Sequence, residues 1–205
     1  MLLRLLIFIS VLVFPSFAVA REKPESPQAI ATEILAPLLD PVKVASLKGD
    51  RPANTRLYKV LFWLETARRA GGEVSEVLDT AQVTARYADT LGARADKTAI
   101  IWNRKNLENF GCLTPEGMAK LRKGGSPAIT RGPHTGDTIA LDHVLPRSIV
   151  PELAARFFNL EAIAASANLA KSAKVTAREV ALARRWNREG LLSTQGLIAI
   201  EDATE

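Results

Sequence analysis

The sequence predicts a mostly helical α+β protein, in which a helical N-terminal region precedes a compact unit of strand, loop, short strand and helix. Apolar residues recur at spacings of three and four through much of residues 28–109, as on the buried face of a helix. The segment "TIALDHV", residues 138–144, alternates instead, as a strand does. The excess of basic over acidic residues is concentrated in residues 103–188.

Four segments account for the helical N-terminal region. "AIATEILAPLLDPV" is the first, and "RPANTRLYKVLFWLETARRAGG", with Asn54 or Thr55 as its cap, is the second. "EVSEVLDTAQVTARYADTLG" is the third, and Gly92 is expected to stop it. The fourth covers 96–109, where Trp102 sits at core spacing, so that packing outweighs a stacking role.

Turn residues and the remaining periodicity order the second half. Thr114 is a good N-cap for a short helix in "LTPEGMAKLRKGG". After the 138–144 strand, "RFFNLEAI" is a second extended candidate. A single helix is expected over 164–188, since this stretch has no Pro or Gly and Gly190 follows it.

The first twenty residues have the features of a signal peptide. Arg4 precedes an apolar stretch, and Ala18-Val19-Ala20 is a small-x-small cleavage pattern. Cleavage after Ala20 would give a periplasmic or secreted protein with no stable membrane span. An uncleaved anchor is the alternative, but the unbroken apolar run is shorter than the ~18 residues that a span needs.

The remaining chain divides by composition into a helical region of unknown role (21–110), a second unit (111–195) and an acidic C-terminal tail (196–205). The single cysteine, Cys112, cannot form an internal disulfide and is expected to be a small buried hydrophobe. The fold must therefore be stabilised by its apolar core.

Charge is concentrated where the strands are expected. The net charge is +5, and the segment Asn103 to Arg188 holds 14 basic and 7 acidic residues, whereas Arg21 to Trp102 holds 12 basic and 11 acidic. A polyanion would be drawn to this segment, although a basic segment alone is more often a solvated surface.

The chemistry of phosphodiester hydrolysis suggests roles for two adjacent residues in this segment. Attack by water needs a base, and His143 suits that role because an unperturbed histidine is largely neutral at neutral pH. Neighbours on a strand point to opposite faces, so Asp142 and His143 can serve one site only where the strand ends. Leu145-Pro146 supplies that ending. Asp142 could then hold a metal ion.

Three further residues could complete such a site. Asn168 offers an amide oxygen as a second hard ligand, with N-capping as the other explanation for an Asn there. Lys171 lies three residues further on the same helical face. Asn159 could bridge backbone groups across the loop and orient the histidine. His134, in "RGPHTGD", is more often a turn residue, with substrate contact as the minor alternative.

The pattern "DHVLPRS", then "NL", then "N" with "K" three residues later resembles the HNH endonucleases of the ββα-metal fold, in the variant whose last position is Asn. The match covers roughly 137–188, about a quarter of the chain. Asn159 follows His143 by sixteen residues and Asn168 follows nine residues later. The resemblance implies an HNH nuclease unit within 111–195.

Roles follow from this resemblance position by position. His143 would be the general base, Asp142 and Asn168 would bind one divalent ion, and Asn159 would hold the loop. Lys171 would contact phosphate near the catalytic centre. The chain lacks the paired Cys-x-x-Cys zinc motifs of many members, and its oxygen ligands favour Mg²⁺ or Mn²⁺. Contacts to nucleic acid are expected from Arg147, Lys171, Lys174 and Arg178.

The expected function is thus that of an exported endonuclease acting on DNA or RNA. One alternative is a catalytically silent module that binds nucleic acid or protein on the same scaffold. Another is a helical envelope protein whose front half, 21–110, binds a partner and regulates the nuclease unit. Protein partners and inhibitors are not specified by the sequence.

Overall fold

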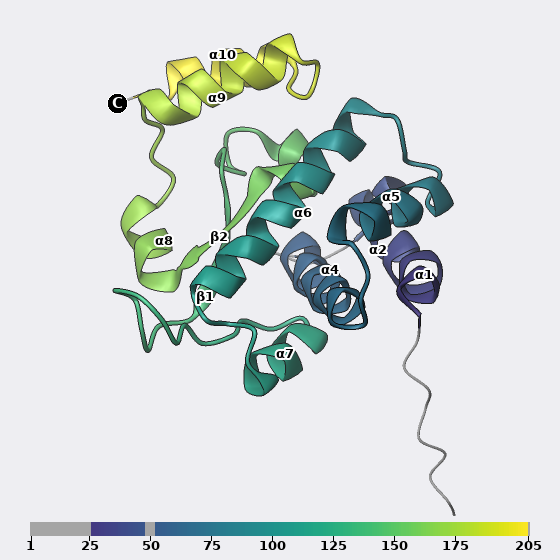
Figure 1. Cartoon of the computed structure of the whole chain (residues 1–205). Coiled ribbons are helices and arrows are strands. Elements are labelled where there is room, and N and C mark those ends of the chain that lie inside the picture. Colours follow the sequence, from purple (N-terminus) through teal and green to yellow (C-terminus); the bar gives the residue numbers. More distant parts are fainter. Residues whose placement is uncertain (1–25, 48–51, 205) are drawn as a thin grey trace, which may run out of the picture.

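The computed structural model describes residues 26–47 and 52–204, and it shows a mostly helical α+β protein with one two-stranded hairpin among those residues (Figure 1). The expected signal peptide, 1–20, lies outside the described residues. No helix in the described part is long and apolar enough to span a membrane.

Helices fill the described chain up to residue 122. The first expected helix is a run with a π-helical centre, made of α1 (Pro27–Ala29), η1 (Ile30–Leu35) and α2 (Ala36–Leu39). It breaks at Asp40, and the short helix α3 (Pro41–Ala45) follows. The helices α4 (Pro52–Arg69), α5 (Val74–Thr84), α6 (Leu91–Asn109) and α7 (Pro115–Arg122) follow.

Two expected helix boundaries are wrong. Gly92 does not stop α5, which ends at Thr84, because Gly92 lies in the first turn of α6 behind a Thr90 cap. Asn54 lies inside α4 and donates its amide to the Leu141 carbonyl at 2.6 Å, so its side chain holds a strand instead of capping a helix. The Thr114 cap of α7 is confirmed, since its hydroxyl accepts from the Gly117 amide at 3.1 Å.

The hairpin pairs β1 (Ile139–His143) with β2 (Leu160–Ala164) in antiparallel register. Asp142 lies opposite Glu161, and His143 lies opposite Leu160. The residues between the strands include two short 3-10 turns, η2 (Pro151–Leu153) and η3 (Phe157–Asn159). Part of the expected extended segment "RFFNLEAI" is therefore 3-10 helix, and only its second half is a strand.

Side chains of the helices complete the hydrogen bonding along both edges of this small sheet. On the β1 side, Asn54 and Tyr58 of α4 donate to the carbonyls of Leu141 and Ile139. On the β2 side, Asn103 of α6 accepts from the Ala162 amide at 2.6 Å and donates to the Leu160 carbonyl at 2.8 Å. Since a bare strand edge leaves such groups unpaired, α4 and α6 take the place of outer strands.

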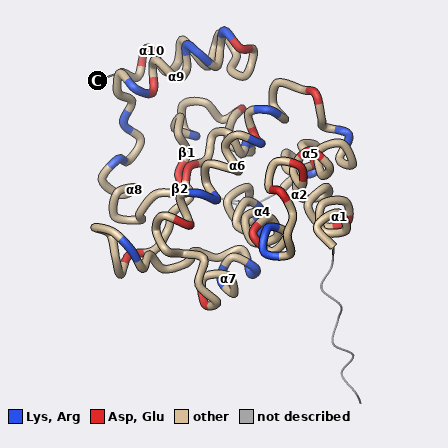
Figure 2. The backbone as a smooth tube through the Cα atoms, viewed as in Figure 1, with Lys and Arg blue, Asp and Glu red and all other residues tan. Residues whose placement is uncertain are grey.

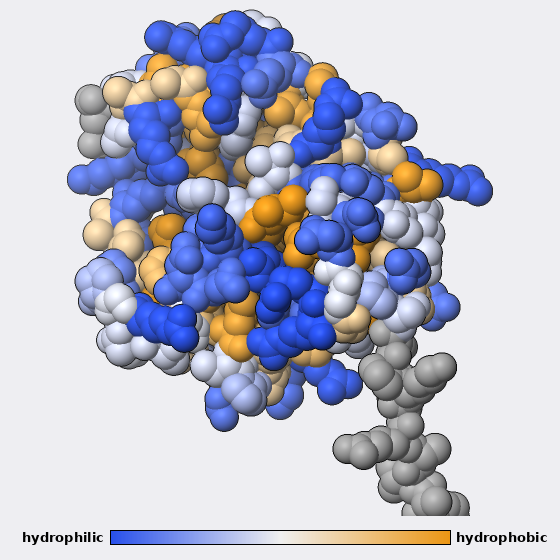
Figure 3. Space-filling view, in the orientation of Figure 1, coloured by the Kyte–Doolittle hydropathy of each residue, from blue (hydrophilic) through white to orange (hydrophobic). Residues whose placement is uncertain are grey.

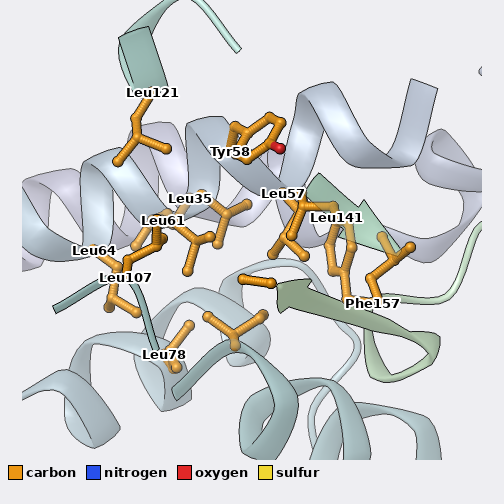
Figure 4. Packing of buried hydrophobic residues seen from close by; sticks show 14 of the residues in the cluster. Leu35, Leu57, Tyr58, Leu61, Leu64, Leu78, Leu107, Leu121, Leu141 and Phe157 are labelled. Carbon is orange, nitrogen blue, oxygen red and sulfur yellow. The ribbon is translucent and has the colours of Figure 1, made fainter. Parts of the chain in front are cut away.

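The main hydrophobic core crosses the expected boundary at residue 110. Leu57, Leu61 and Leu107 from the helical region pack in one cluster with Leu141 and Phe157 from the hairpin (Figure 4). Cys112 is buried in the same cluster as expected, and burial raises the pKa of its thiol to about 11. The helical region and the hairpin thus stabilise each other.

The helix expected over 164–188 is instead two helices. The first, α8 (Ala165–Lys171), ends where Ser172 adopts a φ of 53°, and the second, α9 (Ala177–Arg188), begins behind Thr176. Thr176 and Glu179 form a reciprocal capping box, so the sequence "TARE" did contain the start signal. Buried Val175 lies in the connection.

The acidic end of the chain is helical in the described part. The segment expected as a tail from 196 contributes to α10 (Thr194–Asp202), which packs on α9. Ile200 is fully buried there, and Arg184 of α9 pairs with Glu201 at 2.7 Å. Trp186 of α9 and Ile200 of α10 form a second core cluster with residues of the β1–β2 loop, including Val144, Leu153 and Phe158.

Candidate active site

Asp142 and Glu161 place two carboxylates side by side on the face of the hairpin that α8 approaches. They are register partners, and each side chain is 16% exposed. The Lys171 ammonium lies between them, at 2.6 Å from Asp142 Oδ2 and 3.9 Å from Glu161 Oε1. It also donates to the carbonyls of His143 at 3.0 Å and Val144 at 3.4 Å. The end of β1 therefore forms an all-oxygen cradle around a cation.

His143 has a different partner because alternation along β1 turns it away from Asp142. Its Nε2 lies 3.1 Å from the Ala154 carbonyl, which can only accept, so Nε2 carries the proton in this contact. In the neutral ring, Nδ1 is then the nitrogen that can accept a proton. The imidazole is thus oriented by the loop that connects the strands.

Asn159 is fully buried and fixes that loop from within. Its Oδ1 accepts from the Leu145 amide at 2.8 Å, and its Nδ2 donates to the carbonyls of Leu145 at 3.1 Å and Leu153 at 3.4 Å. Leu145 is two residues after His143, and Leu153 immediately precedes Ala154. The Asn159 amide therefore ties the strand end that carries His143 to the turn that holds its ring.

Buried Asp96 of α6 anchors the same loop from outside. Its Oδ1 accepts from the Phe158 amide at 2.8 Å, and its Oδ2 accepts from the Tyr87 hydroxyl at 2.9 Å. Burial raises the pKa of Asp96 to about 6 despite these hydrogen bonds. An isolated Asp among the apolar residues of a helix gives no sequence signal that it supports a distant loop.

Asn168 occupies the fourth position of α8, one turn before Lys171, and it is half-buried. Ala164 is the cap residue of that helix, so the N-cap explanation for Asn168 is wrong. Across residues 26–47 and 52–204, no hydrogen bond of the Asn168 side chain is found. The Lys171 contact with Asp142 places this face of α8 against the hairpin.

The residues expected to contact nucleic acid differ in their exposure and in their partners. Arg147 and Lys174 are exposed, in the β1–β2 loop and between α8 and α9. Arg178 pairs with Glu161 at 3.1 Å and lies 3.5 Å from Glu179. His134 is in a turn, where its carbonyl accepts from the Asp137 amide. Figure 2 shows basic positions along α8, α9 and their connection, with acidic positions at the hairpin.

Sequence reasoning missed Glu161 and Asp137. Glu161 became visible only through the strand register. Asp137 accepts from the amide of Ser166 in the first turn of α8 and from the amide of Thr138, and these bonds lower the pKa of Asp137. Asp137 thereby fixes the start of α8 to the start of β1, a contact that local sequence does not indicate.

The end of β1 offers oxygen atoms as potential ligands of a divalent ion. Within the described ranges, no three His, Cys, Asp or Glu residues cluster in a way that could hold a metal. Asp142 and Asn168 would thus bind with help from backbone, water or substrate oxygens. The cradle around Lys171 consists of carboxylate and carbonyl oxygens, which suit a hard cation such as Mg²⁺ or Mn²⁺. The oxygen chemistry of the cradle is thus compatible with a hard cation, while its position is taken by the Lys171 ammonium.

Comparison with known proteins gives no family. No family model, no curated protein and no solved structure matches this chain.

Proposed function

We propose that this protein is an exported, divalent-metal-dependent endonuclease of the HNH type, which hydrolyses phosphodiester bonds of DNA or RNA on a ββα-metal unit. The observation that carries the proposal is the arrangement at the end of β1. The Asp142 carboxylate is part of an oxygen-lined cradle around a cation there, while His143 is oriented separately by the Ala154 carbonyl. Hairpin and helix follow in the order that the motif implies.

The roles of His143 and Asn159 follow from their contacts, whereas those of Asp142 and Asn168 as metal ligands follow from the resemblance to the HNH motif. His143 accepts a proton from the attacking water at Nδ1, because Nε2 is committed to Ala154. Asn159 keeps the ring in place through Leu145 and Leu153 and acts as a positioning residue. Asp142 and Asn168 would hold Mg²⁺ or Mn²⁺, which would stabilise charge on the phosphoryl oxygens.

Lys171 has two roles in this proposal. It neutralises Asp142 in the structure, and it would contact a phosphate of the substrate, as the resemblance implies. An ammonium and a metal ion compete for the charge of the same carboxylate, so metal binding would weaken the ion pair between Lys171 and Asp142 Oδ2. Arg147 and Lys174, both exposed, would contact more distant phosphates.

The test is a cleavage assay on duplex DNA, single-stranded DNA and RNA with Mg²⁺, Mn²⁺ or chelator. His143→Ala is expected to slow cleavage by about 10² to 10⁴-fold, the usual contribution of a general base. His134→Ala removes the other histidine of the chain and is the matched control. Wild-type protein that leaves all three substrates intact with each metal, but binds DNA without need of metal, would instead support the silent binding module.

A further inference from the structure

A groove of about 590 Å³ runs between α6 and α9, next to the candidate site. Its α6 wall is formed by residues at spacings of three and four from Leu91 to Trp102, and its α9 wall by residues at similar spacings from Arg178 to Glu189. Val144, Phe158, Leu160 and Trp186 form an apolar floor. Figure 3 shows apolar surface in the band between the α9–α10 pair and α6.

Glu161 joins this groove to the cradle at the end of β1. Its carboxylate lines the groove, pairs with Arg178 at 3.1 Å on that side, and lies 3.9 Å from the Lys171 ammonium on the other. Val144, on the groove floor, directly follows His143 and accepts from Lys171 at 3.4 Å. A chain bound at Asp142 and Lys171 would therefore continue into the groove.

Trp102 is the feature that indicates a ligand with a flat apolar face. Its side chain lines the groove and is 59% exposed, contrary to the expectation that it packs in the core. The core-facing side of α6 at this level is taken by Asn103, which is bonded to β2. A large exposed indole beside an apolar floor offers a flat face on which a nucleobase can stack.

The rim of the groove suits an anionic ligand. Arg94, Arg178 and Arg185 line it, against Glu161 and Glu189. Glu161 is already neutralised by Arg178. Arg185 is exposed, and no ion pair of Arg185 is found in the described part of the chain. The groove thus combines an apolar floor, an aromatic side and arginines, as sites for single-stranded nucleic acid do.

We propose that the groove between α6 and α9 binds unpaired nucleotides of the substrate strand that flank the scissile phosphate. Trp102 stacks on a base, and Arg185 contacts a phosphate. This inference rests on the proposed nuclease function and narrows the substrate to single-stranded or locally unpaired nucleic acid. A base inside a duplex does not offer its face to Trp102, because its neighbours already cover it.

The first experiment measures binding without cleavage. Full-length protein in chelator is titrated into a fluorescein-labelled oligothymidylate and into a duplex of the same length. Wild type is expected to prefer the single strand. Trp102→Ala should weaken that binding about 5- to 100-fold, and Trp102→Phe should recover part of it, since loss of one stacked base has an effect of this size. Arg185→Gln should weaken binding and flatten its salt dependence.

Val83→Ala is the control, because Val83 is 65% exposed on α5 and does not line the groove. Unchanged single-strand affinity in Trp102→Ala would overturn the groove proposal. A shift in sedimentation instead of affinity would also overturn it, in favour of a second copy or a protein partner as the occupant.

The second experiment separates this proposal from the nuclease proposal. Cleavage of single-stranded and duplex DNA is measured for wild type and Trp102→Ala with Mn²⁺. Cleavage by wild type with the same substrate preference in both proteins would refute the groove and leave the nuclease intact. Groove binding by wild type without cleavage under any metal would refute the nuclease and leave a single-strand binding site.

Discussion

Replacement of Asn159 by alanine tests the central claim that a buried amide positions His143. The substitution leaves the Leu145 amide and carbonyl without their partners at 2.8 and 3.1 Å, and it also removes a weaker bond to the Leu153 carbonyl at 3.4 Å. Each buried polar group left unpaired costs about 1 to 3 kcal/mol. Two such groups give an expected loss of about 4 kcal/mol in the free energy of unfolding.

Urea denaturation followed by circular dichroism measures this loss, and a domain of ordinary stability, about 5 to 15 kcal/mol, would remain folded. Asn103→Ala is a matched control. Asn103 is also fully buried, but it bonds β2 and not the loop at Ala154. Both variants should lose stability, whereas only Asn159→Ala should shift the imidazole resonances of His143 in the folded state. A loss below about 1 kcal/mol, within the range of one ordinary hydrogen bond, or unmoved resonances, would refute the reasoning.

Two other predictions concern charge. The Lys171→Gln variant should bind Mn²⁺ about 5-fold more tightly than wild type, because the substitution removes a competing ion pair of about 1 kcal/mol from Asp142. Electron paramagnetic resonance measures the affinity, and the Lys174→Gln variant, altered at an exposed residue, should bind Mn²⁺ as wild type does. Equal affinities of Lys171→Gln and wild type would exclude competition between Lys171 and the metal. The folded-state pKa of Asp96, about 6, lies above its ordinary value of 3.8, so the folded state binds more protons between these values. The free energy of unfolding should therefore fall by roughly 3 kcal/mol as the pH rises from about 4 to 6, and Asp96→Asn should reduce this pH dependence. If the pH dependence of the variant equals that of wild type, another group causes it.

Local signals predicted the elements of the fold better than their arrangement. The alternation in "TIALDHV" identified β1, and Thr114 identified the start of α7, since both depend on neighbouring residues alone. The break at Ser172 was not predicted, because the absence of Pro and Gly from residues 164–188 favoured one helix over the start signal in the "TARE" capping box. A register set across a long loop cannot be derived locally, so the facing of Asp142 and Glu161 was not foreseen.

In the candidate site, too, the sequence suggested the roles of single residues better than the contacts between them. Asn159 was expected to brace the loop, and its hydrogen bonds have that form. The direct Lys171–Asp142 pair was not expected, because the sequence suggested phosphate as the partner of Lys171. Trp102 was wrongly expected in the core. Apolar spacing shows that a helix has a buried face, but it does not show which residues at the edge of that face are covered by neighbouring elements.

The bonding of the sheet edges by α4 and α6 determines how this chain can be shortened or reused. A fragment beginning at residue 111 would keep both strands and the Asp142–His143 pair but would lose Asn54, Tyr58 and Asn103, and with them the partners of four backbone groups. The exposed edges would then be open to pairing with other strands, so we expect the fragment to aggregate. Grafting the hairpin and α8 onto another protein would therefore require a host that supplies equivalent edge partners.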